Sequence, residues 1–100
     1  MSYPLDLGDI AREINREQTR CWGEPEVTIQ ALVLCEEAGE VARIAAKSAQ
    51  RIRPDTRGEW EEELGDVLIV ALGLCALVGV DPEAALLGRL NKLRRRKVQT

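Results

Sequence analysis

The spacing of apolar residues along the chain predicts four helices and no strands. In four segments, apolar side chains recur every three or four positions, which is the period of a helix with one buried face. Gly23, Pro54 and Gly79 interrupt this pattern, and each is a residue type that separates helices. We therefore expect an all-α fold, a four-helix bundle. The expected helices cover approximately residues 7–21, 25–50, 57–77 and 82–96.

Residues next to the expected helix starts support these boundaries. Pro25 suits the first turn of the second helix, where its missing N–H leaves no hydrogen bond unmade. Thr56 and Glu59 have the three-residue spacing of a capping box before the third helix. Asp81 followed by Pro82 is typical of an N-cap and a first helical position.

The third expected helix is apolar around most of its circumference. Such a helix is buried on more than one side, and a single four-helix unit of this length can hardly cover it. We therefore expect oligomerisation, as a homodimer or a homotetramer, to complete the bundle. The main apolar stripe comprises Trp60, Leu64, Val67, Leu68, Ala71, Leu74, Cys75 and Val78.

Length and composition favour one domain that covers residues 1–100. The net charge of −3 argues against broad nucleic-acid binding, so no nucleic-acid partner is expected. The chain has no histidine, which excludes catalytic triads that need an imidazole and zinc sites built on histidine. Three cysteines without a Cys-x-x-Cys pair predict reduced thiols and a cytoplasmic protein.

No targeting or membrane-spanning segment is expected. The N-terminus lacks the basic region and apolar stretch of a signal peptide. The longest uncharged apolar run, residues 67–80, is shorter than the roughly 18 residues that a membrane span needs. The basic run at residues 94–97 is interpreted as a solvated helix end, and a phosphate-facing patch is the alternative.

Two pairs of acidic residues have a spacing that places both members on one helix face. Glu37 and Glu40 are three apart, and so are Glu63 and Asp66. Buried carboxylates are costly unless a cation neutralises them. If the second and third helices pack antiparallel, the pairs face each other and suit a hard cation, Mg²⁺ or alternatively Mn²⁺. The first pair shares its helix face with Ile29, Val33, Val41 and Ile44.

The alternative is that both acidic pairs lie on solvated helix faces, where Glu-x-x-Glu spacing is common. Two observations favour the metal site. The first pair falls within an apolar face, and a second pair recurs on the next helix. Lys47 lies on the same face as Glu40, two turns later, in a position to touch a phosphate.

The acidic residues resemble a family signature. Residues 36–40 and 63–66 are similar to the Glu-x-x-Glu … Glu-x-x-Asp pattern of MazG-type nucleotide pyrophosphohydrolases, in the all-α NTP pyrophosphatase superfamily. The similarity extends from approximately residue 10 to residue 96. The resemblance implies a MazG-like bundle that hydrolyses nucleoside triphosphates to the monophosphate and pyrophosphate with Mg²⁺, in nucleotide-pool cleansing.

The resemblance also implies roles for individual residues. Glu37, Glu40, Glu63 and Asp66 would be the metal ligands, and Glu37 or Glu40 would act as the catalytic base. Packing at a helix end is an alternative role for Trp22, and a solvated position is one for Gln18. The implied substrate-binding residues are Lys47, Asn91, Lys92, Arg95, Gln18 and Trp22.

Two other functions compete with this prediction. The first is a phosphoribosyl-ATP pyrophosphatase of the same superfamily, which shares Glu-Glu-Ala-x-Glu and the Ala-Ala-Lys at residues 45–47. In that family a Tyr-His often follows the conserved aspartate, and this chain lacks it. A non-catalytic helical interaction protein would use the apolar third helix as its interface. Acidic pairs on a buried face argue against it, because an interface has no need of them.

Overall fold

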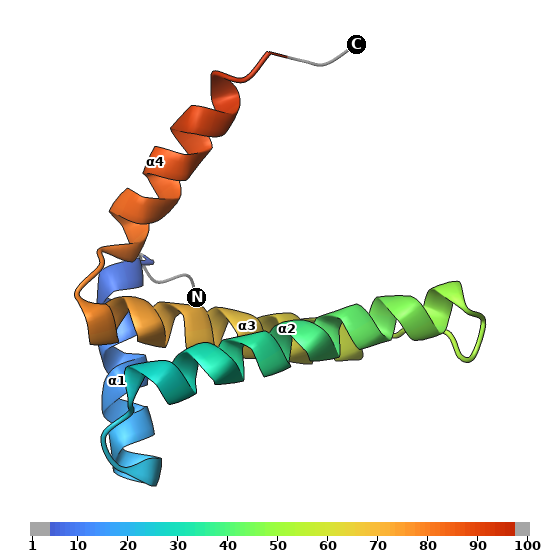
Figure 1. Cartoon of the computed structure of the whole chain (residues 1–100), viewed down its shortest axis with the longest axis horizontal. Helices are drawn as coiled ribbons and strands as arrows, with labels where there is room; N and C mark the ends of the chain where they lie inside the picture. The colour runs from blue at the N-terminus through green and yellow to red at the C-terminus, as the bar shows by residue number, and fades with distance from the viewer. Residues whose placement is uncertain (1–4, 98–100) are drawn as a thin grey trace.

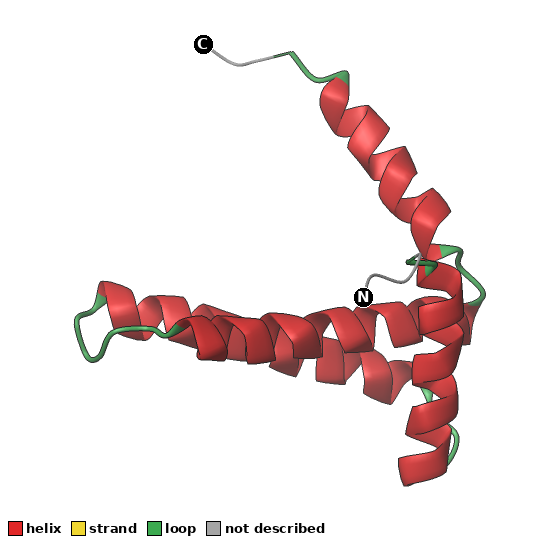
Figure 2. Cartoon of the chain, turned by 180° about the vertical axis from the view of Figure 1, so that it is seen from behind, coloured by secondary structure: helices red, strands yellow, loops and turns green. Residues whose placement is uncertain are grey.

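The computed structural model describes residues 5–97 as four α-helices joined by short connections (Figures 1 and 2). No strand occurs within that range, so the predicted all-α fold is confirmed. The helices are α1 (Leu7–Trp22), α2 (Val27–Ala49), α3 (Arg57–Val78) and α4 (Pro82–Arg94).

Side-chain caps explain where α3 and α4 begin. Thr56 accepts a hydrogen bond from the backbone N–H of Glu59 at 3.2 Å. Asp81 accepts one from the N–H of Glu83 at 3.0 Å, and Pro82 follows at the start of α4. These bonds satisfy N–H groups that a helix leaves unpaired in its first turn. Both predicted caps are therefore confirmed.

The expected start of α2 was wrong. Glu26 is its N-cap, and the carboxylate accepts hydrogen bonds from backbone N–H groups of the first turn at 3.1 and 3.2 Å. Pro25 therefore lies before the cap, and α2 begins at Val27. α4 ends at Arg94, slightly before the expected end near residue 96.

Two of the helices, α2 and α3, form a layer, and α1 and α4 lie outside it (Figure 1). α2 and α3 lie side by side and antiparallel, and α1 crosses α3 near one end of this pair (Figure 1). α3 ends at Gly79, as predicted, with a left-handed φ of 77° that glycine adopts at little cost. The chain then turns, and α4 extends away from the α2–α3 layer and packs mainly against α1 (Figure 2).

A network of polar side chains holds the connection between α2 and α3. Asp55 accepts a hydrogen bond from the Ser48 hydroxyl at 3.0 Å and another from the ring N–H of Trp60. The guanidinium of Arg53 donates to both carboxylate oxygens of Glu59, at 2.7 and 2.6 Å. Trp60 was expected in the apolar core, but it is half-buried, because its ring N–H faces this network.

The buried core is small. Within residues 5–97, the buried apolar residues are Ala11, Ile14, Ile44 and Val70. The radius of gyration is 16.2 Å, whereas a compact domain of this length has one of about 13 Å. The accessible surface is 7974 Å², whereas a folded monomer of this mass exposes about 5,700 Å². A single chain therefore leaves much of its apolar surface uncovered.

None of the helices between residues 5 and 97 is by itself long and apolar enough to cross a membrane. α3 and α4 meet the criteria of length and composition only as a pair, and that pair is bent by 111°.

Candidate functional site

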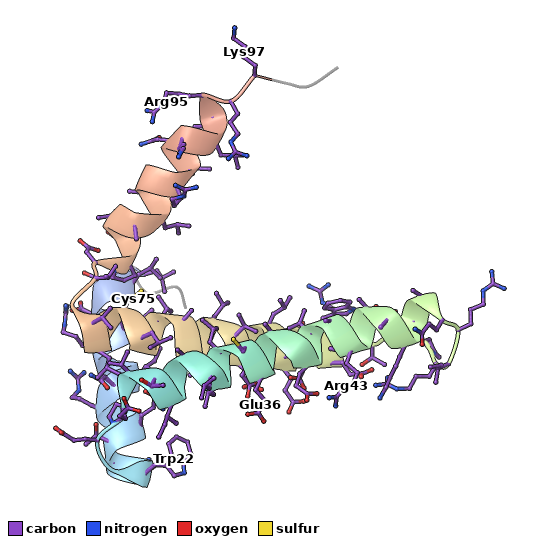
Figure 3. The ribbon with its side chains drawn as sticks, viewed as in Figure 1. Trp22, Glu36, Arg43, Cys75, Arg95 and Lys97 are labelled. Atoms are coloured by element: carbon purple, nitrogen blue, oxygen red, sulfur yellow. The ribbon has the colours of Figure 1, made fainter. Side chains whose placement is uncertain are left out.

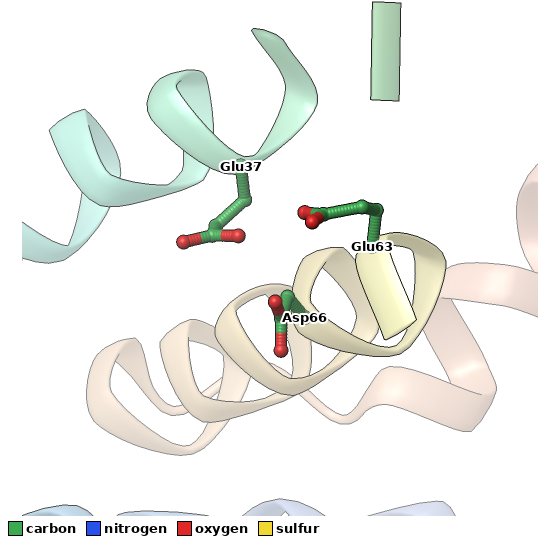
Figure 4. Close-up of side chains that lie close together, drawn as sticks. All are labelled: Glu37, Glu63 and Asp66. Atoms are coloured by element: carbon green, nitrogen blue, oxygen red, sulfur yellow. The ribbon is translucent and has the colours of Figure 1, made fainter. Parts of the chain in front are cut away.

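Three carboxylates from two helices come together between α2 and α3 (Figure 4). Glu37 projects from α2, and Glu63 and Asp66 project toward it from α3. One oxygen of each carboxylate lies within 4.8 Å of the other two. We call these three residues the carboxylate cluster. It contains three of the four residues that were expected to bind a metal.

Helical geometry explains this convergence. Three residues make nearly one helical turn, so Glu63 and Asp66 share one face of α3. α2 runs antiparallel beside α3 and presents Glu37 to that face (Figure 4). Glu36, Glu61 and Glu62 have exposed side chains, as expected. Asp66 of the cluster is exposed too, and Glu37 and Glu63 are only half-buried, so the expected burial of the acidic pairs was wrong.

The carboxylates of the cluster perturb one another. The pKa of Glu37 is raised, first by partial burial and then by the charges of Asp66 and Glu63. The pKa of Glu63 is raised by partial burial and then by the charges of Asp66 and Glu40. Both shifts reflect the cost of holding negative charges close together where the side chains of Glu37 and Glu63 are partly shielded from water. A hard divalent cation would relieve this repulsion, and carboxylate oxygens are its preferred protein ligands.

The fourth expected ligand, Glu40, borders the cluster. Its carboxylate pairs with Arg43 on the same helix at 3.2 Å. Both side chains are partly exposed, so this ion pair contributes little to stability and holds Glu40 weakly. The charge of Glu40 is nevertheless among the causes of the raised pKa of Glu63, after partial burial and Asp66. The structure therefore places Glu40 near the three clustered carboxylates but directed to Arg43.

A cavity of about 710 Å³ adjoins the carboxylate cluster, and α1, α2 and α3 all contribute to its walls. Glu37 and Asp66 belong both to the cluster and to the cavity wall. The volume falls within the range of about 300–1,000 Å³ that is usual for small-molecule sites. The other lining residues are Ile10, Glu13, Ile14, Glu17, Gln18, Cys21, Trp22, Gln30, Val33, Ile69 and Val70.

Two expected substrate-binding residues of α1, Gln18 and Trp22, line this cavity. Trp22 is 82% exposed at the end of α1 (Figure 3), which argues against the alternative that it packs at this helix end. Gln18 is half-buried, which argues against the alternative of a solvated side chain. An aromatic ring and an amide at one cavity suit a flat, polar ligand.

Sequence reasoning missed three polar residues in the cavity wall, Glu13, Glu17 and Gln30. Glu13 and Glu17 are four apart on α1, and Glu17 pairs with Arg20 at 2.8 Å. The available signal was that Glu13 and Glu17 lie three residues after Ile10 and Ile14, and so share a helix face with these apolar residues of α1. It was weak, because polar residues on an amphipathic helix usually face solvent.

The remaining expected substrate residues lie away from the cavity of their own chain. Lys47 is half-buried in the last turn of α2 and is not part of the cavity wall. Asn91, Lys92 and Arg95 are exposed, and Figure 3 shows Arg95 at the far end of α4. Among the described residues, no lysine or arginine lines the cavity.

The fold and the site define a class of protein, namely an all-α protein with a cluster of carboxylates beside a cavity of ligand size. The sequence model of the MazG nucleotide pyrophosphohydrolase domain matches residues 25–100. The chain belongs to this family, and membership supports hydrolase activity on a nucleotide. No curated protein and no solved structure gave a significant match. α1, which carries Gln18 and Trp22, lies outside the matched residues.

Proposed function

We propose that the protein is a Mg²⁺-dependent nucleoside triphosphate pyrophosphohydrolase, with Mn²⁺ as the alternative cation. It would convert a ribo- or deoxyribonucleoside triphosphate and water to the monophosphate and pyrophosphate, in nucleotide-pool cleansing. One observation carries the proposal: Glu37 and Asp66 belong to the carboxylate cluster and to the cavity wall. A nucleoside in the cavity would therefore place its phosphates at the carboxylates.

The carboxylate cluster fits a divalent cation. Its oxygens lie within 4.8 Å of one another, and their charges raise the pKa of Glu37 and Glu63 after partial burial does so. Mg²⁺ is commonly held by a few carboxylates together with substrate phosphates. When bound, such an ion neutralises charge on phosphate oxygens and lowers the pKa of water. No lysine or arginine of the described chain lines the cavity. A cation held by the carboxylate cluster would therefore be the group that neutralises the phosphate charge.

Glu37 and Glu40 are our candidates for the residue that accepts the proton of the attacking water. We favour Glu40, because an oxygen of Glu37 already faces the other two clustered carboxylates. Glu40 borders the cluster and is held only by a partly exposed ion pair with Arg43. A carboxylate is the natural acceptor here, since the chain has no histidine.

The α1 side of the cavity would hold the nucleobase. Trp22 offers an exposed aromatic face for stacking, and Gln18 offers an amide for hydrogen bonds to the base. Lys47, in the last turn of α2, remains a candidate phosphate contact through its ammonium group.

A second copy of the chain would complete the bundle, as a homodimer or within a homotetramer. The chain exposes 7974 Å², about 2,300 Å² more than a folded monomer of this mass. Permanent interfaces bury about 2,000–5,000 Å² counted over both partners, so burial of this excess on each of two chains would fall within that range. The exposed large apolar residues of α3 and α4 are Leu64, Leu68, Ile69, Val78, Leu86, Leu87 and Leu93.

In such an oligomer, α4 would serve the cavity of a neighbouring subunit. Asn91 and Lys92 lie on α4, and Arg95 directly follows it. α4 extends away from the α2–α3 layer (Figure 3) and carries positive groups that the cavity wall lacks. Each subunit would be one domain over residues 1–100. The three free cysteines fit a reducing compartment such as the cytoplasm.

Pyrophosphate release from a panel of triphosphates, with and without Mg²⁺, tests the proposal. We expect release that depends on Mg²⁺ and falls at least about 100-fold in Glu63→Gln, because a metal ligand is lost. Glu62→Gln is the matched control, since Glu62 is adjacent in sequence but exposed and outside the cluster.

The outcomes separate the competing functions. Release from phosphoribosyl-ATP alone would favour the related pyrophosphatase. Absence of pyrophosphate release from every substrate, in the unaltered protein as in Glu63→Gln and Glu62→Gln, would favour a non-catalytic interaction protein.

A further inference from the structure

A close contact between α1 and α3 bears on the cavity. Gly73 is buried in α3, where α1 crosses it. A Cβ atom at Gly73 would lie 3.1 Å from Oε1 and 3.5 Å from Nε2 of Gln18. It would also lie 3.1 Å from Cγ2 of Ile14. Two side chains of the cavity wall, Gln18 and Ile14, therefore rest on a position that has no side chain.

Space, and not backbone conformation, explains glycine at this position. The positive-φ glycines of the described chain are Gly23 and Gly79, so Gly73 has a backbone that any residue can adopt. Glycine is less favourable than alanine inside a helix. A Cβ at Gly39 or Gly65, also inside helices, would meet no atom within 4 Å. Gly73 differs because the Gln18 amide and Ile14 occupy the place of its missing methyl group.

We propose that Gly73 is a positioning residue that seats the Gln18 amide at the nucleobase end of the cavity and so sets the preferred base. The inference rests on the proposed function. The amide carries a hydrogen-bond acceptor and donors in one plane. Bases with amino groups and bases with oxo groups present opposite patterns of donors and acceptors. A shift of the amide would therefore change which base is matched.

The contact makes this shift unavoidable when a methyl group is added. A Cβ at 3.1 Å from the amide oxygen is closer than ordinary van der Waals contact. Both contacts must give by a few tenths of an ångström. The terminal amide of Gln18 can do so by turning about its side-chain torsions, whereas the buried Ile14 requires a small adjustment where α1 crosses α3. Gly73→Ala would therefore displace the Gln18 amide within the cavity wall, and an Ile14 variant distinguishes this effect from a change of helix spacing.

The test measures binding of four α,β-imido deoxynucleoside triphosphates by calorimetry with Mg²⁺, which requires no turnover. In Gly73→Ala we expect the ratio between the tightest and weakest base to shrink about 3- to 10-fold, the equivalent of one hydrogen bond. Gly58→Ala in the same helix is the control and should keep the ratio, since the nearest atom to its Cβ is 4.0 Å away.

Two further variants show whether the methyl group acts through Gln18. Gln18→Ala should lose base preference to the same extent, and the double variant with Gly73→Ala should lose no more. If Ile14→Leu, which removes the contacting Cγ2 atom but keeps the side-chain volume, restores the preference of Gly73→Ala, the methyl group acts through helix spacing and the proposal is wrong. An unchanged preference in Gln18→Ala overturns it even if Gly73→Ala does not fold.

A parallel turnover assay on the unaltered protein, Gly73→Ala and Gln18→Ala separates the two proposals. Base-selective binding without turnover contradicts the proposed function, while the variants still test Gly73. Turnover with the same base preference in the unaltered protein, Gly73→Ala and Gln18→Ala contradicts only the positioning role. Absence of both binding and turnover overturns both.

Discussion

At the scale of single residues, the carboxylate cluster favours ligand binding at the expense of stability. Glu37, Glu63 and Asp66 hold three negative charges within reach of one another. The pKa values of Glu37 and Glu63 are raised, first by partial burial and then by neighbouring charges, so ionisation is less favourable there than in water. A group whose pKa is raised on folding stabilises the fold at acidic pH and loses this contribution as pH rises through the folded pKa. The metal-free protein is therefore under electrostatic strain at neutral pH.

Glu63→Gln should relieve this strain. We expect the metal-free variant to have a higher free energy of unfolding at pH 7 than the unaltered protein, because one repelling charge is gone. The stabilisation by added Mg²⁺ should fall in the same variant, since a ligand is lost. Urea unfolding in EDTA and in Mg²⁺ measures both effects. Glu62→Gln should change both much less, since the charge of Glu62 is only a lesser cause of the raised pKa of Glu63, after partial burial, Asp66 and Glu40. A less stable Glu63→Gln in EDTA would contradict the prediction.

At the scale of elements, the network between α2 and α3 sets how the two helices enter their antiparallel pairing. The pKa of Asp55 is lowered, first by the hydrogen bond from Trp60 and then by that from Ser48. The pKa of Glu59 is lowered by its hydrogen bonds with Arg53. Lowered pKa values mean that these ionised carboxylates stabilise the fold above their unfolded pKa values, and that the contribution is lost as pH falls through the folded ones.

Trp60→Phe should make this connection more sensitive to acid. The variant keeps an aromatic ring but removes the N–H that donates to Asp55. The pKa of Asp55 should therefore rise toward its ordinary value of 3.8, and the network should open at a higher pH than in the unaltered protein. NMR titration of Asp55 and hydrogen exchange at residues 50–56 measure the change. Trp22→Phe, at an exposed ring, should leave both unaffected.

At the scale of the whole molecule, an open shape and a small core indicate that folding and assembly are linked. Few apolar residues of the described chain are buried, whereas Leu64 and Leu68 of α3 are 46% and 61% exposed. They are four apart on the helix that the sequence predicts to be covered by a partner. Stability should therefore depend on protein concentration, as it does for chains that fold only on association.

Leu68→Glu should disrupt the oligomer. Burial of one leucine contributes about 1.5–3 kcal/mol, so its loss weakens association at least about tenfold per contact. Light scattering should give a dimer or tetramer mass for the unaltered protein and a smaller mass, with a lower Tm, for the variant. Ile52→Glu is the control, because Ile52 is similarly exposed, at 64%, but lies outside the helices. A monomer mass for the unaltered protein at micromolar concentration would refute the oligomer.

Much of the fold could be predicted because helix boundaries depend on neighbouring residues. The caps at Thr56 and Asp81 and the stop at Gly79 follow from residue types within one turn. The error at Pro25 has the same local origin, since proline suits the position before an N-cap as well as the first turn. The candidate site was less predictable, because its residues come from three helices.

Helical periodicity alone was sufficient to propose four helices and to place two acidic pairs each on one helix face, because both depend on the 3.6-residue turn. The rotation and crossing of the helices depend on contacts between distant residues, such as Gly73 with Ile14 and Gln18. The packing of α2 against α3 brings Glu37 to Glu63 and Asp66, whereas the pairing of Glu40 with Arg43 is a local contact within α2. The contacts between helices also form the cavity with α1, which no spacing within one helix could have indicated.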